Sequence, residues 1–167
     1  MRVIGALLLI AAASGFGMIR ASELRKRPAV LHAMINAIML LKSDISSRGM
    51  SLPDAAAHVA GQCAEMIRPM FLTVCVMLKR DSGTFFDAWN SGIDEISCLL
   101  PQEAESLRDL GAHLGKYDVS AQANALEACI DAMNEYEHGA AQDFKQFGRL
   151  YTGLGLTVGT MLAVALY

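Results

Sequence analysis

The stretch PAVLHAMINAIMLLKSDI, residues 28–45, decides the fold because its apolar residues recur at helical spacing. One face of this stretch carries only apolar side chains: Val30, Leu31, Met34, Ile35, Ile38, Leu41 and Ile45. Pro28 suits the first turn of a helix, and Ser47 and Gly49 suit its end. The pattern predicts a helix that begins near Pro28, ends near Ser47 and buries this face in a core.

The apolar residues of the following hundred positions keep helical spacing, and no stretch shows sustained alternation of β-branched residues. Further helices are predicted near residues 52–66, 68–80, 85–99, 102–115 and 119–149. Short joints between so many helices favour a compact bundle. The sequence therefore predicts an all-α fold, a compact bundle of about six helices.

Two apolar runs without charged side chains flank this region, at residues 3–19 and 150–167. The first would span about 26 Å as a helix, close to the ~30 Å hydrocarbon core of a membrane. In the second, Gly155, Gly159 and Ala163 recur every four residues, a spacing that lets two helices approach closely in lipid. We expect three parts: an N-terminal transmembrane helix (1–19), a helical domain (20–149) and a C-terminal transmembrane helix (150–167).

The distribution of positive charge predicts the orientation of these two spans. Only Arg2 lies at their outer ends, whereas the inner ends carry Arg20, Arg25, Lys26, Arg27, Lys145 and Arg149. Positive residues favour the cytosolic side, so the domain between the spans is expected in the cytosol. The alternative is a cleaved signal peptide, since Ala11 to Ala13 offers a cleavage site, and it would give an exported domain with one C-terminal anchor.

Composition narrows the range of possible functions. Of the 167 residues, 53% are hydrophobic and 19% charged, and the net charge of −3 gives no reason to expect nucleic-acid binding. The charge is unevenly distributed: residues 20–80 hold nine Lys and Arg against four acids, and residues 81–143 hold thirteen acids against two basic residues. Four cysteines without a C-x-x-C pair exclude a zinc ribbon, a thioredoxin-type motif and a disulfide-rich scaffold.

Two predicted helices begin with a similar pattern of a hydroxyl followed three residues later by an acid. These pairs, Ser51 with Asp54 and Thr84 with Asp87, have the form of capping boxes. Trp89 follows the second pair and is expected in the core. Capping accounts for all four polar residues, so these positions indicate structure and not chemistry.

Motifs for common reactions are missing from the sequence, which has no phosphate-binding loop, no G-x-S-x-G elbow and no H-E-x-x-H. An alternative to a non-enzymatic protein is a metal or carboxylate site around Glu135 and His138, whose spacing occurs in di-iron bundles. That site would need a second copy of the motif and two more glutamates. Asp54 with His58 and Asp109 with His113 are interpreted as surface pairs within a helix. We predict no cofactor and no metal.

An acidic set lies around one predicted turn between helices: Asp94, Glu95, Glu103, Glu105 and Asp109. It is interpreted either as a solvated face or as a docking surface for a basic partner.

Several stretches together resemble the stage III sporulation protein AB family. They are RKRP (25–28), AIMLLKSDI (37–45), SLPDA (51–55), DAW (87–89) and LGAHLGKYD (110–118) followed by Gln122. The most specific part is a motif formed by Leu110, Gly111, Leu114, Gly115, Asp118 and Gln122. Gly115 can end one helix and Asp118 can cap the next, so this motif also has a structural explanation.

The resemblance covers essentially the whole chain and implies a function. It implies that the protein is a component of the mother-cell membrane that faces the forespore. This component is needed for a channel-like complex, similar to a secretion system, in sporulation. The soluble part of that family is similar to the F-type platform proteins of type II secretion and type IV pilus systems. The implied partners are a cytosolic secretion-type ATPase, stage III sporulation protein AA, and other membrane components of the channel.

Overall fold

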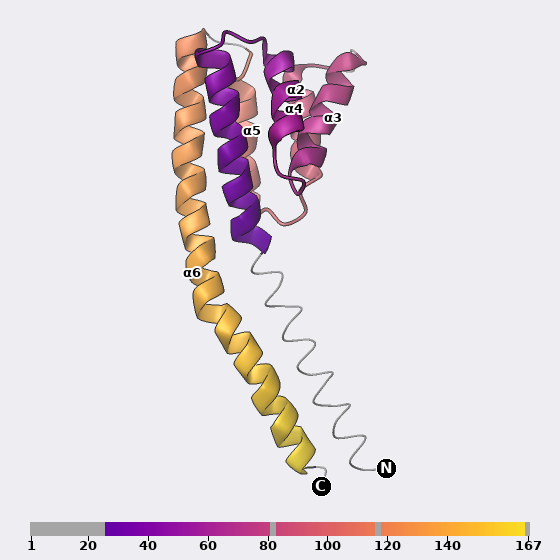
Figure 1. Cartoon of the computed structure of the whole chain (residues 1–167), viewed down its shortest axis with the longest axis vertical. Coiled ribbons are helices and arrows are strands. Elements are labelled where there is room, and N and C mark those ends of the chain that lie inside the picture. The colour runs from indigo at the N-terminus through magenta and orange to yellow at the C-terminus, as the bar shows by residue number, and fades with distance from the viewer. Residues whose placement is uncertain (1–25, 81–82, 116–117, 166–167) are drawn as a thin grey trace. The chain divides into compact units, whose positions relative to one another are not determined.

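The computed structural model describes residues 26–80, 83–115 and 118–165, with side chains as far as residue 146 (Figure 1). Six helices follow one another: Lys26–Ser46, α2 (Leu52–Gln62), α3 (Arg68–Lys79), α4 (Phe85–Asp94), α5 (Pro101–His113) and α6 (Val119–Ala165). The described residues contain no strand, which confirms the predicted all-α fold of about six helices.

The chain divides into two compact units. One consists of Ala29–Glu137, and the other combines the residues up to Pro28 with those from His138 onward. In the second unit, α6 continues as a helix to Ala165, and Arg27 forms an ion pair with Asp143 (Nη1 to Oδ2, 3.6 Å). The predicted N-terminal span (1–19) lies outside the described residues, as do the side chains of the predicted C-terminal span.

The Lys26–Ser46 helix provides the core of the first unit. The seven apolar residues that the sequence places on one face are all buried, and Leu31, Met34 and Ile38 are fully inaccessible to solvent. By length and composition this helix could also cross a membrane, but 56% of its apolar window is buried inside the protein. Its apolar face is therefore occupied by protein, as expected for the core helix of a bundle.

Helices α2 to α5 pack in chain order, α2 against α3, α3 against α4 and α4 against α5. Trp89 of α4 lies at the centre, as predicted, with no exposed surface. Its ring meets Phe71 edge to face at 5.9 Å between centroids and stacks on Phe85 at 5.7 Å. The indole N–H donates to the carbonyl oxygen of Leu107 at 2.7 Å, so the polar atom of this buried side chain is satisfied.

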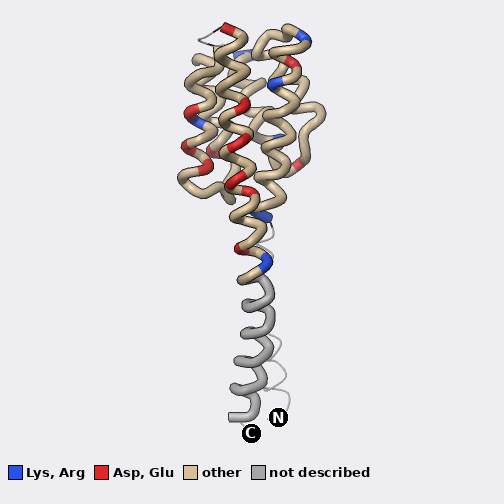
Figure 2. Tube along the Cα trace, turned by 90° about the vertical axis from the view of Figure 1, so that its left-hand side faces the viewer, with Lys and Arg blue, Asp and Glu red and all other residues tan. Residues whose placement is uncertain are grey.

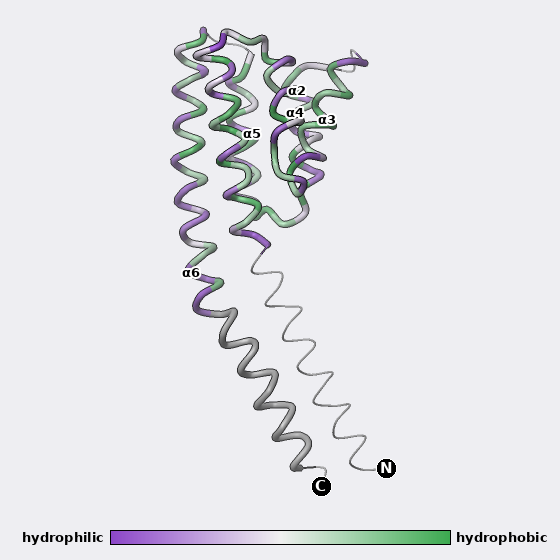
Figure 3. The backbone as a smooth tube through the Cα atoms, viewed as in Figure 1, coloured by the Kyte–Doolittle hydropathy of each residue, from purple (hydrophilic) through white to green (hydrophobic). Residues whose placement is uncertain are grey.

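Helix α6 covers the first unit with one buried face. Leu126 and Met133 are fully buried, and hydrophilic and hydrophobic residues alternate from one side of the helix to the other in its described part (Figure 3). Its opposite face is exposed and carries acids, several of which are visible from that side (Figure 2). This amphipathic pattern fits a helix at the surface of a bundle.

Two helices end earlier than the sequence predicts. Helix α2 ends at Gln62 and not near residue 66, because Cys63 adopts an extended conformation and its carbonyl oxygen accepts from the Arg68 guanidinium at 3.2 Å. Helix α4 ends at Asp94 and not near residue 99. There the chain must reach Pro101, and the residue before a proline is held in an extended conformation.

Candidate functional site

Four of the five acids that were predicted to meet a partner form an exposed acidic surface, defined by Asp94, Glu95, Glu105 and Asp109. The first two lie at the end of α4, and the others lie one turn apart on α5. Asp94 is paired with Arg108 (Nη2 to Oδ1, 2.7 Å), but the Asp94 side chain is 67% exposed and that of Arg108 is 43% exposed, so this pair contributes little stability. The surface keeps a negative character that a basic partner could recognise.

Glu103, the fifth predicted acid, is not part of this surface. Its side chain is completely buried, and its carboxylate accepts the backbone N–H of Leu100 at 2.8 Å. That N–H lies at the start of α5, where the helix itself offers it no partner. The prediction that Glu103 meets a partner is therefore corrected: Glu103 caps α5 from within the protein.

A groove runs beside the acidic surface between α5 and the first part of α6, with a volume of about 420 Å³. We call it the α5–α6 groove. Its walls are formed by Ser106, Asp109, Leu110, His113, Ala121, Ala125, Ala128, Cys129 and Ala132. The four alanines follow one another at steps of four, three and four residues, so they line one strip of α6. Sequence analysis missed this groove, although the alanine spacing was the signal that could have revealed it.

The cysteine in the groove is not a reactive group. Burial raises the pKa of the Cys129 thiol to about 12, and the nearby negative charge of Asp109 adds to the effect. The thiol is therefore protonated at neutral pH and makes only a long contact, 3.9 Å, with the carbonyl oxygen of Ser106. The groove offers shape and an acidic edge to a ligand, without a nucleophile from this residue.

The exposed face of α6 carries an acidic ridge, defined by Glu127, Asp131 and Glu135, which recur every four residues. Glu127 accepts from Lys42 of the first helix at 3.0 Å, and no ion pair within the described residues involves the other two. Like charges one turn apart repel each other, so the ridge slightly weakens the helix that carries it.

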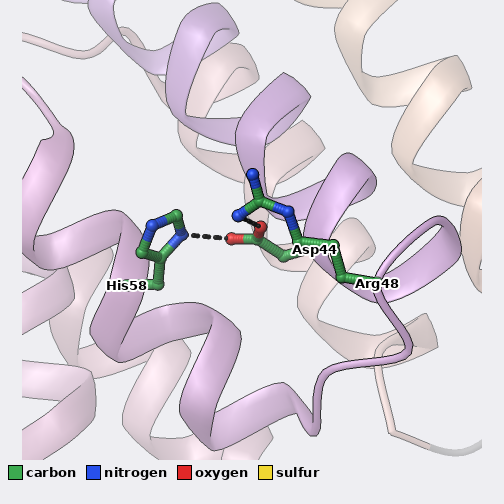
Figure 4. A network of polar contacts seen from close by, with 3 residues as sticks. All are labelled: Asp44, Arg48 and His58. Carbon is green, nitrogen blue, oxygen red and sulfur yellow. Dashed lines mark hydrogen bonds and ion pairs between the residues drawn. The ribbon is translucent and has the colours of Figure 1, made fainter.

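A buried polar network joins the first helix to α2 (Figure 4). Asp44 has no exposed side-chain surface, and its carboxylate oxygens contact His58 Nδ1 at 2.7 Å and Arg48 Nη1 at 2.9 Å. The predicted pairing of His58 with Asp54 is wrong, because Asp54 accepts the hydroxyl of Ser51 instead. We interpret the network as a structural link, since both partners contact a carboxylate that would otherwise be buried alone.

The residues of the alternative metal site, Glu135 and His138, are both exposed on α6. The described residues contain no group of three or more His, Cys, Asp or Glu side chains that could hold a metal ion. For the second predicted helical pair, the His113 ring contacts the backbone carbonyl oxygen of Asp109 at 2.8 Å and not its carboxylate.

The polar residues of the stretches that resemble the family cap the starts of helices. Ser51 accepts the N–H of Asp54, and Thr84 and Asp87 form a complete capping box. The hydrogen bonds from Thr84 hold the pKa of the Asp87 carboxyl below its ordinary value. At the start of α6, Asp118 accepts from Ser120 and from the N–H of Ala121, and its pKa is lowered in the same way.

Gly115 and Gly111 account for the two glycines of the Leu110–Gln122 motif. Gly115 follows the end of α5 with a φ of +80°, in the left-handed region that favours glycine. Gly111 lies against the Trp89 ring.

The predicted juxtamembrane and membrane residues are only partly described. Arg20 and Arg25 lie outside the described residues, and Lys26 begins the first helix. Gly155, Gly159 and Ala163 fall within the helical part of α6, where side chains are not described, so their role in helix packing stays a prediction.

These features define a class of protein: a helical domain with an acidic surface, an open groove and polar residues that serve mainly to cap helices. The model of the stage III sporulation protein AB family matches residues 2–167, and the chain belongs to that family. Stage III sporulation protein AB of Bacillus subtilis (strain 168) is 22% identical over 169 residues, which cover 99% of both chains. A solved structure of stage III sporulation protein AB has a similar fold, with a TM-score of 0.65 and 24% identity over 71% of this chain and 96% of its own.

Proposed function

We propose that this protein is a non-enzymatic platform in the mother-cell membrane, on the side facing the forespore, and that it couples a cytosolic ATPase to the membrane components of a secretion-like sporulation channel. Membership of the stage III sporulation protein AB family supports a role in sporulation. The acidic surface carries the coupling part of the proposal, because it exposes Asp94, Glu95, Glu105 and Asp109 on α5 and at the end of α4. Such a surface attracts a basic partner and orients it.

In this proposal residues 1–19 and 150–167 span the membrane, and residues 20–149 lie in the cytosol. The charge-free run at residues 3–19 and the positive residues beside both spans support this arrangement. The continuation of α6 as a helix to Ala165 supports a helical second span. The secretion-type ATPase, stage III sporulation protein AA, would supply the energy, since the chain has no phosphate-binding loop of its own.

A binding experiment tests the coupling. We expect the Glu95→Lys/Glu105→Lys variant to recover at least about tenfold less ATPase than the wild type, because like charges would then face each other across the interface. The measurement is co-purification of the ATPase with the tagged full-length protein from detergent-solubilised membranes of sporulating cells. Both residues are exposed, so the variant should unfold at the same temperature as the wild type.

The matched control is Asp131→Lys/Glu135→Lys, which makes the same change of charge at exposed positions on α6. It should recover the ATPase normally. Normal recovery with the first variant would refute the acidic surface as the docking site, and an ATPase that never co-purifies with the wild type would refute the coupling itself. Glu103 is unsuitable for this test because a charge reversal there would act on the buried cap of α5.

A further inference from the structure

Helix α3 carries an apolar stripe that no other part of the described structure covers. Leu72 and Val76 are 49% and 46% exposed, and they follow the exposed Pro69 on the same face. Met66, just before the helix, is 49% exposed. We call these four residues the α3 stripe. Apolar side chains grouped on one exposed helix face are typical of a contact surface.

Exposed basic residues stand beside the α3 stripe, together with one exposed acid, Glu65, which directly precedes Met66. Helix α3 contains no acid, and Arg68 and Lys79 are exposed beside the stripe at its two ends. No ion pair within the described residues involves either of them, and the side chain of Arg68 donates to a backbone carbonyl. A partner for this surface needs a place for large apolar side chains and acids at its edge.

The α5–α6 groove has both properties. Its alanines leave room for larger side chains, and its volume of about 420 Å³ can take several of them. Asp109 lines its α5 side. On α6, Glu135 follows the groove alanine Ala132 by three residues and lies on the strip next to it. Asp131 lies one turn earlier on that strip, where it also lines a neighbouring groove beside Lys42 of the first helix. Small side chains thus line the groove, and acids flank it on α5 and on α6. The large apolar side chains and the basic residues of the α3 stripe complement it in size and in charge.

The two surfaces lie at different sides of the first unit, with α3 and the first part of α6 at opposite edges of the bundle in the view of Figure 1. One copy therefore cannot join its own stripe to its own groove. We propose that the protein associates head to tail, with the α3 stripe of one copy seated in the α5–α6 groove of the next. Such a contact joins two different surfaces and leaves one of each free, so it can extend into a ring or a row of copies.

Complementation between two charge variants tests this proposal. Variant A, Leu72→Glu/Lys79→Glu, makes the stripe acidic, and variant B, Asp131→Lys/Glu135→Lys, makes the edge of the groove basic. Each variant alone should associate at least about tenfold more weakly than the wild type. A mixture of the two should recover, because the normal stripe of B fits the normal groove of A and the acidic stripe of A fits the basic groove of B.

The measurement is sedimentation velocity of the full-length protein in detergent, over a range of protein and salt concentrations. The wild type should form oligomers that weaken as salt is added. The Glu95→Lys/Glu105→Lys variant is the matched control: it should lose the ATPase but keep self-association, so the failure of one proposal is distinguishable from the failure of the other. A circular dichroism spectrum and a thermal midpoint equal to those of the wild type exclude unfolding as the cause of any loss.

Three results would overturn the proposal. The wild type could stay monomeric at all concentrations, the variants could associate as well as the wild type, or the mixture of A and B could fail to recover. If variant B stayed like the wild type in association but lost the ATPase, the groove would be the site of that partner and not of a second copy.

Discussion

Gly111 permits a close contact in the core. A Cβ atom at this position would clash with Cδ1 of Trp89, and the ring cannot withdraw because it is fully buried and held by its hydrogen bond to Leu107. We expect Gly111→Ala to lower the free energy of unfolding by about 1–3 kcal/mol, because overpacking forces the helices apart. Trp89 is the single tryptophan of the chain, so its fluorescence reports unfolding in urea.

Gly61 provides the control for this prediction. It lies within α2, and an added Cβ atom would meet nothing within 4 Å. Gly61→Ala should therefore raise the free energy of unfolding by roughly 0.5–1 kcal/mol through its better helix propensity. If both substitutions changed stability equally, the contact with Trp89 would not be the reason for glycine at position 111.

Two histidines show how burial decides how much a contact with a carboxylate stabilises the protein. His58 contacts Asp44, which has no exposed surface, whereas His32 contacts Glu137 at 3.2 Å with 63% of its own side chain exposed. His58→Leu should cost about 1–3 kcal/mol, because the buried carboxylate loses one of its two side-chain partners. His32→Leu should cost under about 1 kcal/mol. Urea unfolding of both variants measures the difference, and equal costs would contradict a structural role for the Asp44 network.

At the scale of the element, the starts of helices were easier to predict than their ends. Ser51, Thr84 and Asp118 cap α2, α4 and α6, and a cap depends on residues only three positions apart. The ends of α2 and α4 depend on contacts with the next segment, such as the hydrogen bond from Arg68 to Cys63. Local spacing carries no information about these contacts, so the predicted ends were four or five residues late.

The candidate site shows the same division between local and distant information. The sequence identified the acids of the acidic surface, but it could not separate the buried Glu103 from its exposed neighbour Glu105. The difference depends on which side of α5 faces the core. The partner of His58 was also missed, since Asp44 is 14 residues away and on another helix. The α5–α6 groove exists only once two helices are packed together.

The caps of α4 and α6 predict how stability depends on pH. The pKa values of Asp87 and Asp118 are lowered in the folded protein by hydrogen bonds to their carboxylates. A carboxyl whose pKa is lowered by folding stabilises the protein above its unfolded pKa, near 3.8, and this contribution is lost as the pH falls through the lower folded value. The wild type should therefore lose part of its stability in acid, at and below about pH 4.

The double variant Asp87→Asn/Asp118→Asn isolates this contribution. It cannot titrate at either cap, so its thermal midpoint should fall less between pH 6 and pH 2 than that of the wild type, and the two curves should approach each other in acid. Parallel curves would show that other carboxyls cause the acid sensitivity. Both aspartates are exposed at helix starts, so the substitutions leave the core unchanged.

At the scale of the whole molecule, charge is separated along the chain and on the surface. The segment before residue 81 is mainly basic, and the segment after it is mainly acidic. In the proposed function, the basic residues beside the predicted spans would hold the domain on the cytosolic side of the membrane, and the acidic surface and the acidic ridge would bind partners. The two groups of charges therefore have different roles, and they can be tested separately.

The membrane topology of the protein tests the proposed role of the basic residues beside the predicted spans. With the four native cysteines replaced by alanine, a single cysteine at the exposed position of Glu105 should resist a membrane-impermeant maleimide in intact cells that express the protein. Permeabilising the membrane should make it react fully. A cysteine in place of Arg2, outside the first predicted span, should react in intact cells and serves as the control. Labelling of the cysteine at position 105 in intact cells would reverse the assignment, because the domain could then reach no cytosolic ATPase, and the exported alternative with one C-terminal anchor would take its place.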